Sequence, residues 1–518
     1  MRFDKTKNAS KNIVFGVILK LYHIIVPFLM RTAMIYLLGV EYLGLDGLFS
    51  SVLAVLNLAE LGIGSAMIYS MYKPIAEDDG ETICALMRLY KVYYRIIGLI
   101  VLCGGLILCP FIPRLISGGV PDGLNVYVLY LLNLAATVLS YWLFAYKSCL
   151  LQAHQRSDLI SKITLIAHTA RYVLQFVFLF IFRNYYYYLI IALVTQLLIN
   201  IFTALVADKL FPKYRAVGVL PKPVKDGINR KIKDLFTAKI GAVVVDSVGT
   251  IVISAFLGLS VLGIYQNYFY IVTALTGVIN IVMTSCMAGI GNSIVTENKD
   301  KVFGDFKTFN LIISWIAGFC TTALLVMYQP FMKLWVGAEN MFDFSAVICF
   351  SAYFCIKQFN TLLNVYKDAA GIWHKDRFRP LVTAMVNLAL SLIIVQFWGI
   401  YGVLLATIIS MLFVGMPWIV GNLFTELFAK KHLSEFLKQI FFYVIIIVLL
   451  CFASYGVCSF VTFDGIIGLA IRLIIVSVIF NVVYILIFFK TKEFKNVLKI
   501  ANRLTRGKIG PLNKIANK

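Results

Sequence analysis

Two lysines of this chain lie inside apolar segments, where an ammonium group is costly. Lys20 and Lys239 are 219 residues apart, and Arg31 follows Lys20 by three helical turns, so that both lie on one face of a helix. Ionisable groups inside membrane segments usually line a polar interior and mark the path of a substrate or ion. We therefore predict that Lys20, Arg31 and Lys239 bind an anionic substrate. The alternative is that Lys20 and Arg31 extend along their helix to opposite membrane surfaces.

Two further cations, Arg171 and Lys357, lie near the middle of their apolar segments. A central position is the hardest one from which a long side chain can reach the membrane surface, so both are stronger candidates for substrate binding. Tyr268 lies in the polar run Tyr265-Gln-Asn-Tyr268, whose groups suit sugar hydroxyls and rings. Ordinary helix–helix packing with internal hydrogen bonds is the alternative interpretation of that run.

Two acids are candidates for ion coupling. Asp246 follows Lys239 by seven residues, which places it on the same helix face about 10 Å away. A carboxylate at that depth is suited to bind H+ or Na+, although a partner on another helix could equally satisfy it. Glu60 could pair with a cation of the first helix or coordinate an ion. The five cations outnumber the two acids, and a net positive cavity suits an anion such as a phosphate. We expect no metal and no cofactor beyond a possible coupling ion.

The elements that position these residues are predicted to be membrane-spanning helices. The 518 residues are 61% hydrophobic and 14% charged, and apolar runs of about 20 residues, enough to cross a bilayer, recur along the whole chain. We predict an all-α integral membrane protein with fourteen transmembrane helices. Their expected ranges are about 12–38, 43–71, 90–112, 124–150, 158–182, 185–208, 234–257, 263–288, 306–328, 343–365, 381–398, 402–426, 438–460 and 466–489. The tyrosines 185–188 are expected to form an aromatic belt at an external helix end.

The net charge of +22 is explained by membrane topology and not by nucleic-acid binding. Of the 47 Lys and Arg residues, only Arg114, Arg183 and Lys333 fall on one set of alternate loops, and six lie within spans. The rest lie at the termini and on the other set of loops, which the positive-inside rule makes cytoplasmic. We predict that both termini are cytoplasmic and that the basic tail from Lys490 touches anionic membrane lipids.

An internal repeat relates the two halves of the chain. A shift of 219 residues places Leu37-Leu-Gly-Val-Glu-Tyr-Leu-Gly44 on Phe256-Leu-Gly-Leu-Ser-Val-Leu-Gly263. Because six helices return the chain to its starting side, the halves would be parallel repeats, an arrangement common in transporters. The predicted parts are an N-lobe at 1–209, a basic connector at 210–233, a pseudo-symmetric C-lobe at 234–427, and two more helices with a basic tail at 428–518.

No enzyme motif is present in the sequence. It has no Walker sequence, HExxH or nucleophile elbow, so we expect a protein that makes and breaks no bond.

Several segments resemble those of a known family. Ile251 to Tyr268, Leu38 to Leu45, Phe331 to Gly337 and Gly399 to Gly402 are similar to segments of Wzx-type polysaccharide flippases, which belong to the multidrug/oligosaccharidyl-lipid/polysaccharide (MOP) exporter superfamily. The resemblance covers nearly the whole chain. It implies two six-helix lobes that open alternately to each side of the bacterial inner membrane. It also implies an undecaprenyl-pyrophosphate-linked oligosaccharide as substrate, with surface-polysaccharide polymerase and glycosyltransferases as partners.

The family's buried cavity cations carry over to Lys20, Arg31 and Lys239 alone, and the resemblance fixes neither the saccharide nor the coupling ion. Three alternatives stay open: a lipid II flippase of the same superfamily, a multidrug exporter, and a membrane-embedded glycosyltransferase or ligase. A cation exporter should have an acidic or apolar cavity, and an embedded transferase normally needs a large external loop. The basic cavity and the short external loops disfavour both of these.

Overall fold

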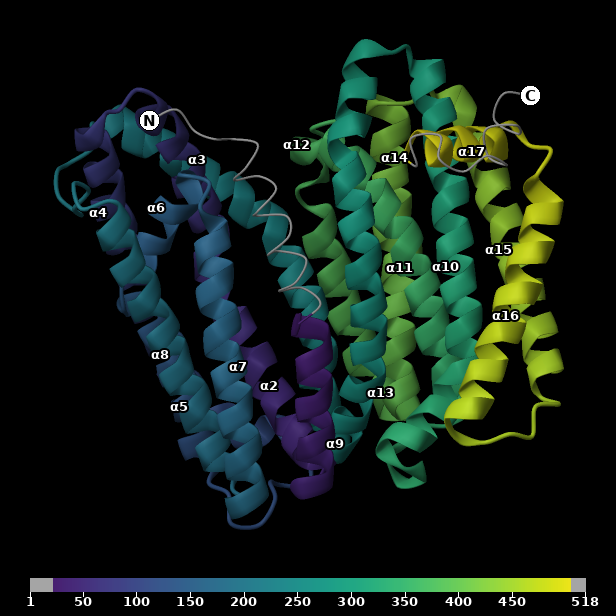
Figure 1. The fold of residues 1–518 in the computed structure, drawn as a ribbon, viewed down its shortest axis with the longest axis horizontal. Coiled ribbons are helices and arrows are strands. Elements are labelled where there is room, and N and C mark those ends of the chain that lie inside the picture. Colours follow the sequence, from purple (N-terminus) through teal and green to yellow (C-terminus); the bar gives the residue numbers. More distant parts are fainter. Residues whose placement is uncertain (1–21, 505–518) are drawn as a thin grey trace. The chain divides into compact units, whose positions relative to one another are not determined.

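A computed structural model describes residues 22–504 of the chain, without the side chains of residues 59, 234, 235, 237–239, 242, 246, 501, 503 and 504. These residues form helices, and no strand occurs among them (Figure 1). After a helix at Tyr22–Leu37, the α-helices are α2 (Val40–Leu56), α3 (Ile63–Ala76), α4 (Gly80–Leu108), α5 (Val126–Trp142), α6 (Ser148–Ala153), α7 (Ser157–Phe182), α8 (Tyr185–Leu210), α9 (Lys222–Thr296), α10 (Lys299–Val336), α11 (Phe344–Ala369), α12 (Trp373–Asp376), α13 (Arg379–Ser410), α14 (Met416–Glu426), α15 (Leu433–Cys458), α16 (Gly465–Phe488) and α17 (Lys492–Leu504).

Nine helices among the described residues are long and apolar enough to cross a membrane, or ten if a bent pair at Val126–Trp142 and Ala145–Ala153 forms one span. The all-helical membrane class is therefore confirmed, whereas the predicted number of fourteen is not. Two of the nine, at Val243–Thr296 and Trp373–Glu426, are each 54 residues long, which is more than twice the length that one crossing needs. Each contains a glycine with non-helical backbone, Gly258 (φ 89°, ψ 177°) and Gly399 (φ 51°, ψ −128°).

The chain divides into two compact units, residues 1–266 and 267–518. The predicted division at the connector 210–233 stays a prediction, because the structure assigns the first part of α9 to the first unit. Only residues 211–221 of that connector lie outside helices. Within this stretch, the Gly218 carbonyl accepts a hydrogen bond of 2.9 Å from the Arg88 guanidinium of α4. At the start of α9, Asn229 Oδ1 accepts one of 2.6 Å from the Tyr93 hydroxyl of α4.

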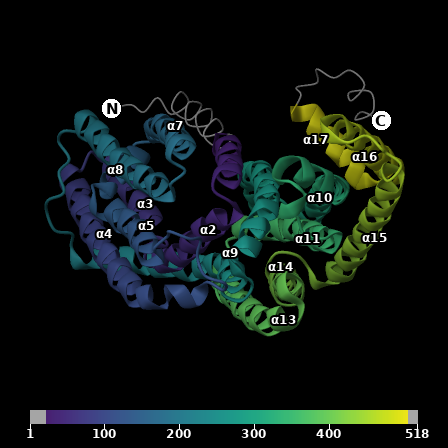
Figure 2. The same ribbon diagram turned by 90° about the horizontal axis from the view of Figure 1, so that it is seen from below.

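In the first unit, α4, α5, α7 and α8 run side by side as a bundle (Figures 1 and 2). Two of its helical stretches are broken. A 3-10 turn at Asn57–Glu60 and Gly62, with φ 91°, separate α2 from α3. Phe144, in the left-handed region with φ 57°, separates α5 from a 3-10 turn at Ala145–Lys147 and α6. These breaks give the unit polar backbone and side chains in the middle of otherwise apolar segments.

Helix α2 and the first part of α9 meet through residues that the 219-residue shift relates to each other. A Cβ atom on Gly44 would overlap the Leu259 carbonyl oxygen, and a Cβ on Gly263 would overlap that of Val40. The Ser260 hydroxyl donates to Glu41 Oε1 at 2.7 Å, again between positions 219 apart. Reciprocal contacts of this kind are the signature of a two-fold axis. Gly39, with φ 125°, and Gly258, with φ 89°, also occupy equivalent places and break the helix in both repeats.

In the second unit, α10 packs against α11, α15, α16 and α17 (Figure 2). The Trp315 indole donates to Asn481 Oδ1 at 2.8 Å, and the Ser314 hydroxyl hydrogen-bonds that of Tyr484. A Cβ on Gly318 would press on Phe480 and Ile447. The two helices expected beyond the repeat are therefore closely packed onto it.

Candidate functional site

The first unit contains two arginines and one carboxylate that interact electrostatically, and we call them the Arg31–Asp46–Arg171 cluster. Asp46, on α2, is half-buried and lies within electrostatic range of both guanidinium groups. Arg31, on the helix at Tyr22–Leu37, also donates to Gln266 Oε1 of α9 at 3.3 Å. Gly47 leaves room for this amide, because a Cβ at that position would overlap Gln266 Nε2. The cluster carries two positive charges and one negative charge.

Hydrogen bonds within the α7–α8 pair orient Arg171. Its Nε donates to Gln175 Oε1, one turn along α7, at 3.2 Å. Gln175 is fully buried and its amide donates to the Tyr188 carbonyl of α8 at 2.8 Å. The guanidinium carbon lies 5.5 Å from the centre of the Tyr172 ring. A planar guanidinium held on one side retains N–H groups for an anion on the other.

Two of the four consecutive tyrosines face this cluster. Tyr185 and Tyr188 are 1% and 7% exposed, and their rings stack at 5.7 Å. The Tyr185 hydroxyl donates a long hydrogen bond of 3.5 Å to Asp46 Oδ1. Tyr187 is 40% exposed and keeps the outward position that an aromatic belt requires. The four tyrosines therefore lie partly in the interior of the unit and partly on its surface.

Aromatic and histidine side chains continue the polar surface along α7. The His23 and His168 rings lie 5.2 Å apart in an edge-to-face arrangement, and Tyr22 lies 6.2 Å from Tyr172. His23 shares its helix with Arg31, and His168 precedes Arg171 by one turn. The histidine contact thus joins the two helices that carry Arg31 and Arg171.

Glu60 lies elsewhere in the first unit, in the break between α2 and α3. Its two carboxylate oxygens accept hydrogen bonds from the Tyr94 and Tyr141 hydroxyls, both at 2.8 Å. Tyr90 in turn donates to the Tyr94 hydroxyl at 2.6 Å. A carboxylate inside a ring of tyrosines has oxygen neighbours that suit a small cation or a proton. Its predicted role in ion coupling stays a prediction.

The second unit contains two of the predicted site residues, in different surroundings. Lys357, on α11, is half-buried. Its ammonium donates to the Tyr353 hydroxyl at 2.9 Å and lies 6.0 Å from the Phe269 ring centre. Tyr268 is fully buried. Its hydroxyl donates to Gln329 Oε1 at 3.1 Å and accepts from the Phe342 amide at 3.3 Å. These contacts place Tyr268 in the packed core of the unit.

The side chains of three predicted site residues lie outside the part of the chain that the structure describes. Lys20 precedes the first described residue, and the side chains of Lys239 and Asp246 are among those not described. Their predicted roles stay predictions. Among the described residues, no group of three or more His, Cys, Asp or Glu side chains could hold a metal ion.

Asp46 is the site residue that the sequence reasoning missed. It stands in Leu45-Asp46-Gly47, close to the expected start of a helix at 43, where an acid is unremarkable at a membrane surface. The helix begins instead at Val40, which moves Asp46 further into the apolar segment. The available signal was an acid two residues before the apolar run Leu48-Phe49.

No protein-family model matches this sequence, and no curated protein matches it. Solved structures do. A structure of the lipid II flippase MurJ in an inward closed conformation gives a TM-score of 0.66 at 15% identity, over 92% of this chain and 99% of that one. An inward-facing multidrug resistance MATE family transporter of the MOP superfamily gives 0.60 at 14% identity, over 81% and 99%. A MATE transporter of Vibrio cholerae gives 0.52 at 13% identity, over 80% and 96%.

The chain has the fold of MOP-superfamily transporters. At these identities the likeness concerns the fold, and together with the apolar helices it makes the chain a multi-pass membrane protein. The proteins of like fold are described as a flippase and as transporters.

Proposed function

We propose that this protein is a flippase for lipid-linked oligosaccharides. Its substrate would be an undecaprenyl-pyrophosphate-linked oligosaccharide that moves from the inner to the outer leaflet of the bacterial cytoplasmic membrane for surface-polysaccharide assembly. The protein would cross the membrane fourteen times with both termini cytoplasmic, and its lobes would open alternately to each side. Polymerase and glycosyltransferases would act on the same lipid.

The observation that supports this proposal is the Arg31–Asp46–Arg171 cluster. Its three members are two guanidinium groups and one carboxylate in apolar segments, so the cluster is net positive. Arginine binds phosphate through paired, charge-assisted hydrogen bonds. A pyrophosphate that enters from the cytoplasmic leaflet would be attracted to this positive charge.

The proposed mechanism requires only binding and movement. Lys20, Arg31, Arg171, Lys239 and Lys357 would hold the pyrophosphate and the nearest sugars, while the polyprenyl tail stays in lipid. Tyr268 has the contacts of a core residue, and we leave it out of the proposed site. A proton or Na+ at Asp246 or Glu60 would link the ion gradient to the change of lobe orientation. Asp46 would hold the arginines in place when no substrate is bound.

A lipid II flippase is the second candidate. The likeness to the MurJ structure, which spans 92% of this chain, favours it, and lipid II also presents a pyrophosphate to the cluster. A multidrug exporter for organic cations has less support, because the described cluster is net positive.

Complementation separates these candidates. The chain should restore surface polysaccharide and prevent inner-leaflet accumulation of lipid-linked oligosaccharide in a strain that lacks its own flippase. Lys20→Ala and Lys239→Ala should each impair this rescue without lower protein levels in the membrane. Normal polysaccharide with both substitutions together would contradict the proposed role of the lysines. Rescue of a strain depleted of its lipid II flippase would favour the second candidate, and raised resistance to cationic dyes would favour the exporter.

A further inference from the structure

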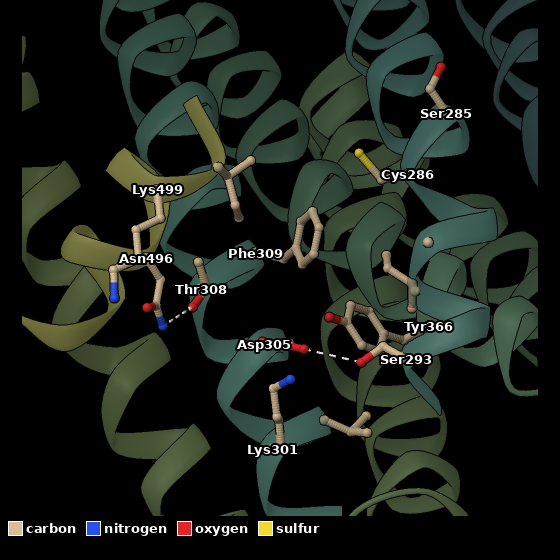
Figure 3. Close-up of a pocket in the computed structure, with 14 residues that line it drawn as sticks. Ser285, Cys286, Ser293, Lys301, Asp305, Thr308, Phe309, Tyr366, Asn496 and Lys499 are labelled. Carbon is tan, nitrogen blue, oxygen red and sulfur yellow. Dashed lines mark hydrogen bonds between the residues drawn. The ribbon is translucent and has the colours of Figure 1, made fainter. Parts of the chain in front are cut away.

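A cavity of about 510 Å³ lies in the second unit, beneath the amphipathic helix α17 (Figure 3). Its walls come from four helices. They are the end of α9, the start of α10, the end of α11, and α17. The cavity is separate from the Arg31–Asp46–Arg171 cluster, which belongs to the first unit, and the proposed transport mechanism does not use it.

Helix α17 is fixed to α10 by specific contacts. Phe494 is 6% exposed and its ring stacks on Trp315 at 5.9 Å. Glu493 pairs with Lys307 at 3.2 Å, and the Asn496 amide donates to Thr308 Oγ1 at 3.4 Å. The helix follows the last apolar span, α16, after a short turn. A short basic amphipathic helix in this position typically lies in the headgroup layer of a membrane, and we expect the cavity to open at that level.

The cavity lining is suited to a phosphodiester. Lys301 of α10 and Lys499 of α17 supply two positive charges, and Asp305 supplies one negative charge. Lys301 pairs with Glu297 at 2.8 Å at an exposed position, where such pairs are weak enough to yield to a stronger anion. Lys499 makes no ion pair with any described residue. Hydroxyl groups of Ser285, Ser293 and Thr308 complete the polar part of the wall.

Tyr366 adds a polar group to the cavity wall. Its side chain is 1% exposed and lines the cavity. Figure 3 shows the hydroxyl turned into the cavity, on the side of Asp305 and Lys301. An acceptor on a bound headgroup could therefore receive a hydrogen bond from this hydroxyl. Asp305 Oδ2 already accepts from the Ser293 hydroxyl at 3.1 Å.

We propose that this cavity binds the headgroup of an anionic phospholipid, with the phosphodiester between Lys301 and Lys499. The net lining charge of one matches the single charge of phosphatidylglycerol. The glycerol hydroxyls of that lipid suit Asp305 and Tyr366. Ile290, Val302, Phe309 and Ile500 supply the apolar part of the lining, where the first carbons of the acyl chains would lie. The bound lipid would hold α17 against α9 and α11.

Thermal unfolding of the purified full-length protein in detergent tests this site. Phosphatidylglycerol should raise the unfolding temperature more than phosphatidylethanolamine with the same acyl chains. Inorganic phosphate and glycerol 3-phosphate should have little effect. We expect weaker lipid binding in a Lys301→Gln/Lys499→Gln variant, since each lysine contributes to attraction of an anionic lipid. The phosphatidylglycerol concentration that gives half of the maximal rise in unfolding temperature should increase about tenfold or more. Tyr366→Phe should reduce the shift further without loss of folding.

The matched control changes two lysines of α17 that do not line the cavity, Lys492→Gln/Lys495→Gln. In this variant phosphatidylglycerol should raise the unfolding temperature as much as in the unchanged protein. The variant loses the same charge, but at positions outside the cavity. The proposal is overturned if both double variants lose the shift equally, since that result indicates general attraction to anionic surfaces. It is also overturned if inorganic phosphate stabilises the protein as well as phosphatidylglycerol does, or if no lipid shifts unfolding. A normal elution profile of each variant on size exclusion confirms that the protein is folded.

Discussion

At the scale of single residues, the charges of the Arg31–Asp46–Arg171 cluster decide what it can bind. One buried guanidinium costs several kcal/mol unless it is paired. Asp46 interacts electrostatically with both Arg31 and Arg171, which lowers the cost of burying them. The three side chains together carry one net positive charge, which favours an anionic substrate over a cationic one.

Arg171→Gln should lower flipping about 10- to 100-fold, because a hydrogen bond to a charged group contributes roughly 1.5–3 kcal/mol. The rate is measured as surface polysaccharide per unit of membrane protein in complemented cells. Arg114→Gln is the control. It removes an exposed arginine of the 3-10 turn at Cys109–Leu115, which is not part of the cluster, and it should leave transport unchanged.

Asp46→Asn separates the two possible roles of Arg171. If the arginine binds substrate, the Arg171→Gln/Asp46→Asn variant should still transport poorly, because the guanidinium that holds the substrate is absent. If the arginine serves only to neutralise Asp46, the double variant should transport normally. That second result would remove Arg171 from the substrate site.

Glu60→Gln should uncouple transport from the ion gradient while the fold is kept, since the amide oxygen can still accept from one tyrosine. Ion–substrate coupling is typically worth about 1–3 kcal/mol, so the stimulation by a proton or Na+ gradient should fall by roughly 5- to 150-fold. Gradient-driven uptake in proteoliposomes measures this effect. Tyr141→Phe removes one hydrogen bond to Glu60 and keeps its charge, and it should stay gradient-dependent. An unaltered gradient response in Glu60→Gln would assign the acid a structural role.

The sequence predicted the types of site residue better than their grouping. Arg31 and Arg171 were identified as buried cations because a charge in an apolar run is visible without coordinates. Their convergence on Asp46 was not, since it depends on how α2, α7 and α8 pack, and a helix boundary only three residues in error moved Asp46 to the membrane surface. Tyr268 shows why the sequence left two interpretations open, because a polar segment has the same composition whether it faces a ligand or another helix.

At the scale of elements, the α2–α9 crossing depends on glycine. Gly44→Ala should lower the free energy of unfolding by about 1–3 kcal/mol, the usual cost of overpacking, because its Cβ would overlap the Leu259 carbonyl oxygen. Gly263→Ala should cost a similar amount, because it makes the equivalent overlap with Val40. Chemical denaturation in detergent measures both changes.

Gly421→Ala is the comparison for the glycine crossing. Gly421 lies within α14, and a Cβ there would meet nothing within 4 Å. This substitution should be neutral or stabilising by up to about 1 kcal/mol, because alanine is the better helix former. If all three substitutions behave alike, the crossing is looser than the contacts indicate.

The helix breaks and α17 show where sequence patterns are insufficient. The glycine breaks at Gly39 and Gly258 were visible as repeat-related motifs. The break at Phe144 was not, because a phenylalanine in the left-handed region is held there by its surroundings and not by its own preference. The segment after Lys490 was interpreted as a basic tail. Its helix depends on Phe494 packing against Trp315, a contact between segments 179 residues apart.

At the scale of the whole molecule, the repeat relates cations of the two halves. The 219-residue shift pairs Lys20 with Lys239. Residues related by the same shift touch each other within the first unit, where α2 meets the first part of α9. If both lysines bind the substrate, as proposed, each repeat contributes one cation from an equivalent position in the sequence.

The number of membrane crossings is the prediction that tests this arrangement most directly. The helical stretches at Val243–Thr296 and Trp373–Glu426 are each 54 residues long, about 80 Å if they were straight. Fourteen crossings require each stretch to turn at Gly258 or Gly399 on the outer side. In a cysteine-free background, Ser260→Cys and Trp398→Cys should react with a membrane-impermeant maleimide in intact spheroplasts. Val219→Cys, which is 81% exposed in the basic connector, should react only after permeabilisation, because basic loops stay cytoplasmic. If the cysteines at positions 260 and 398 do not react in intact spheroplasts, each stretch crosses the membrane only once. The chain would then have two crossings fewer than predicted, and the two lobes would not be equivalent.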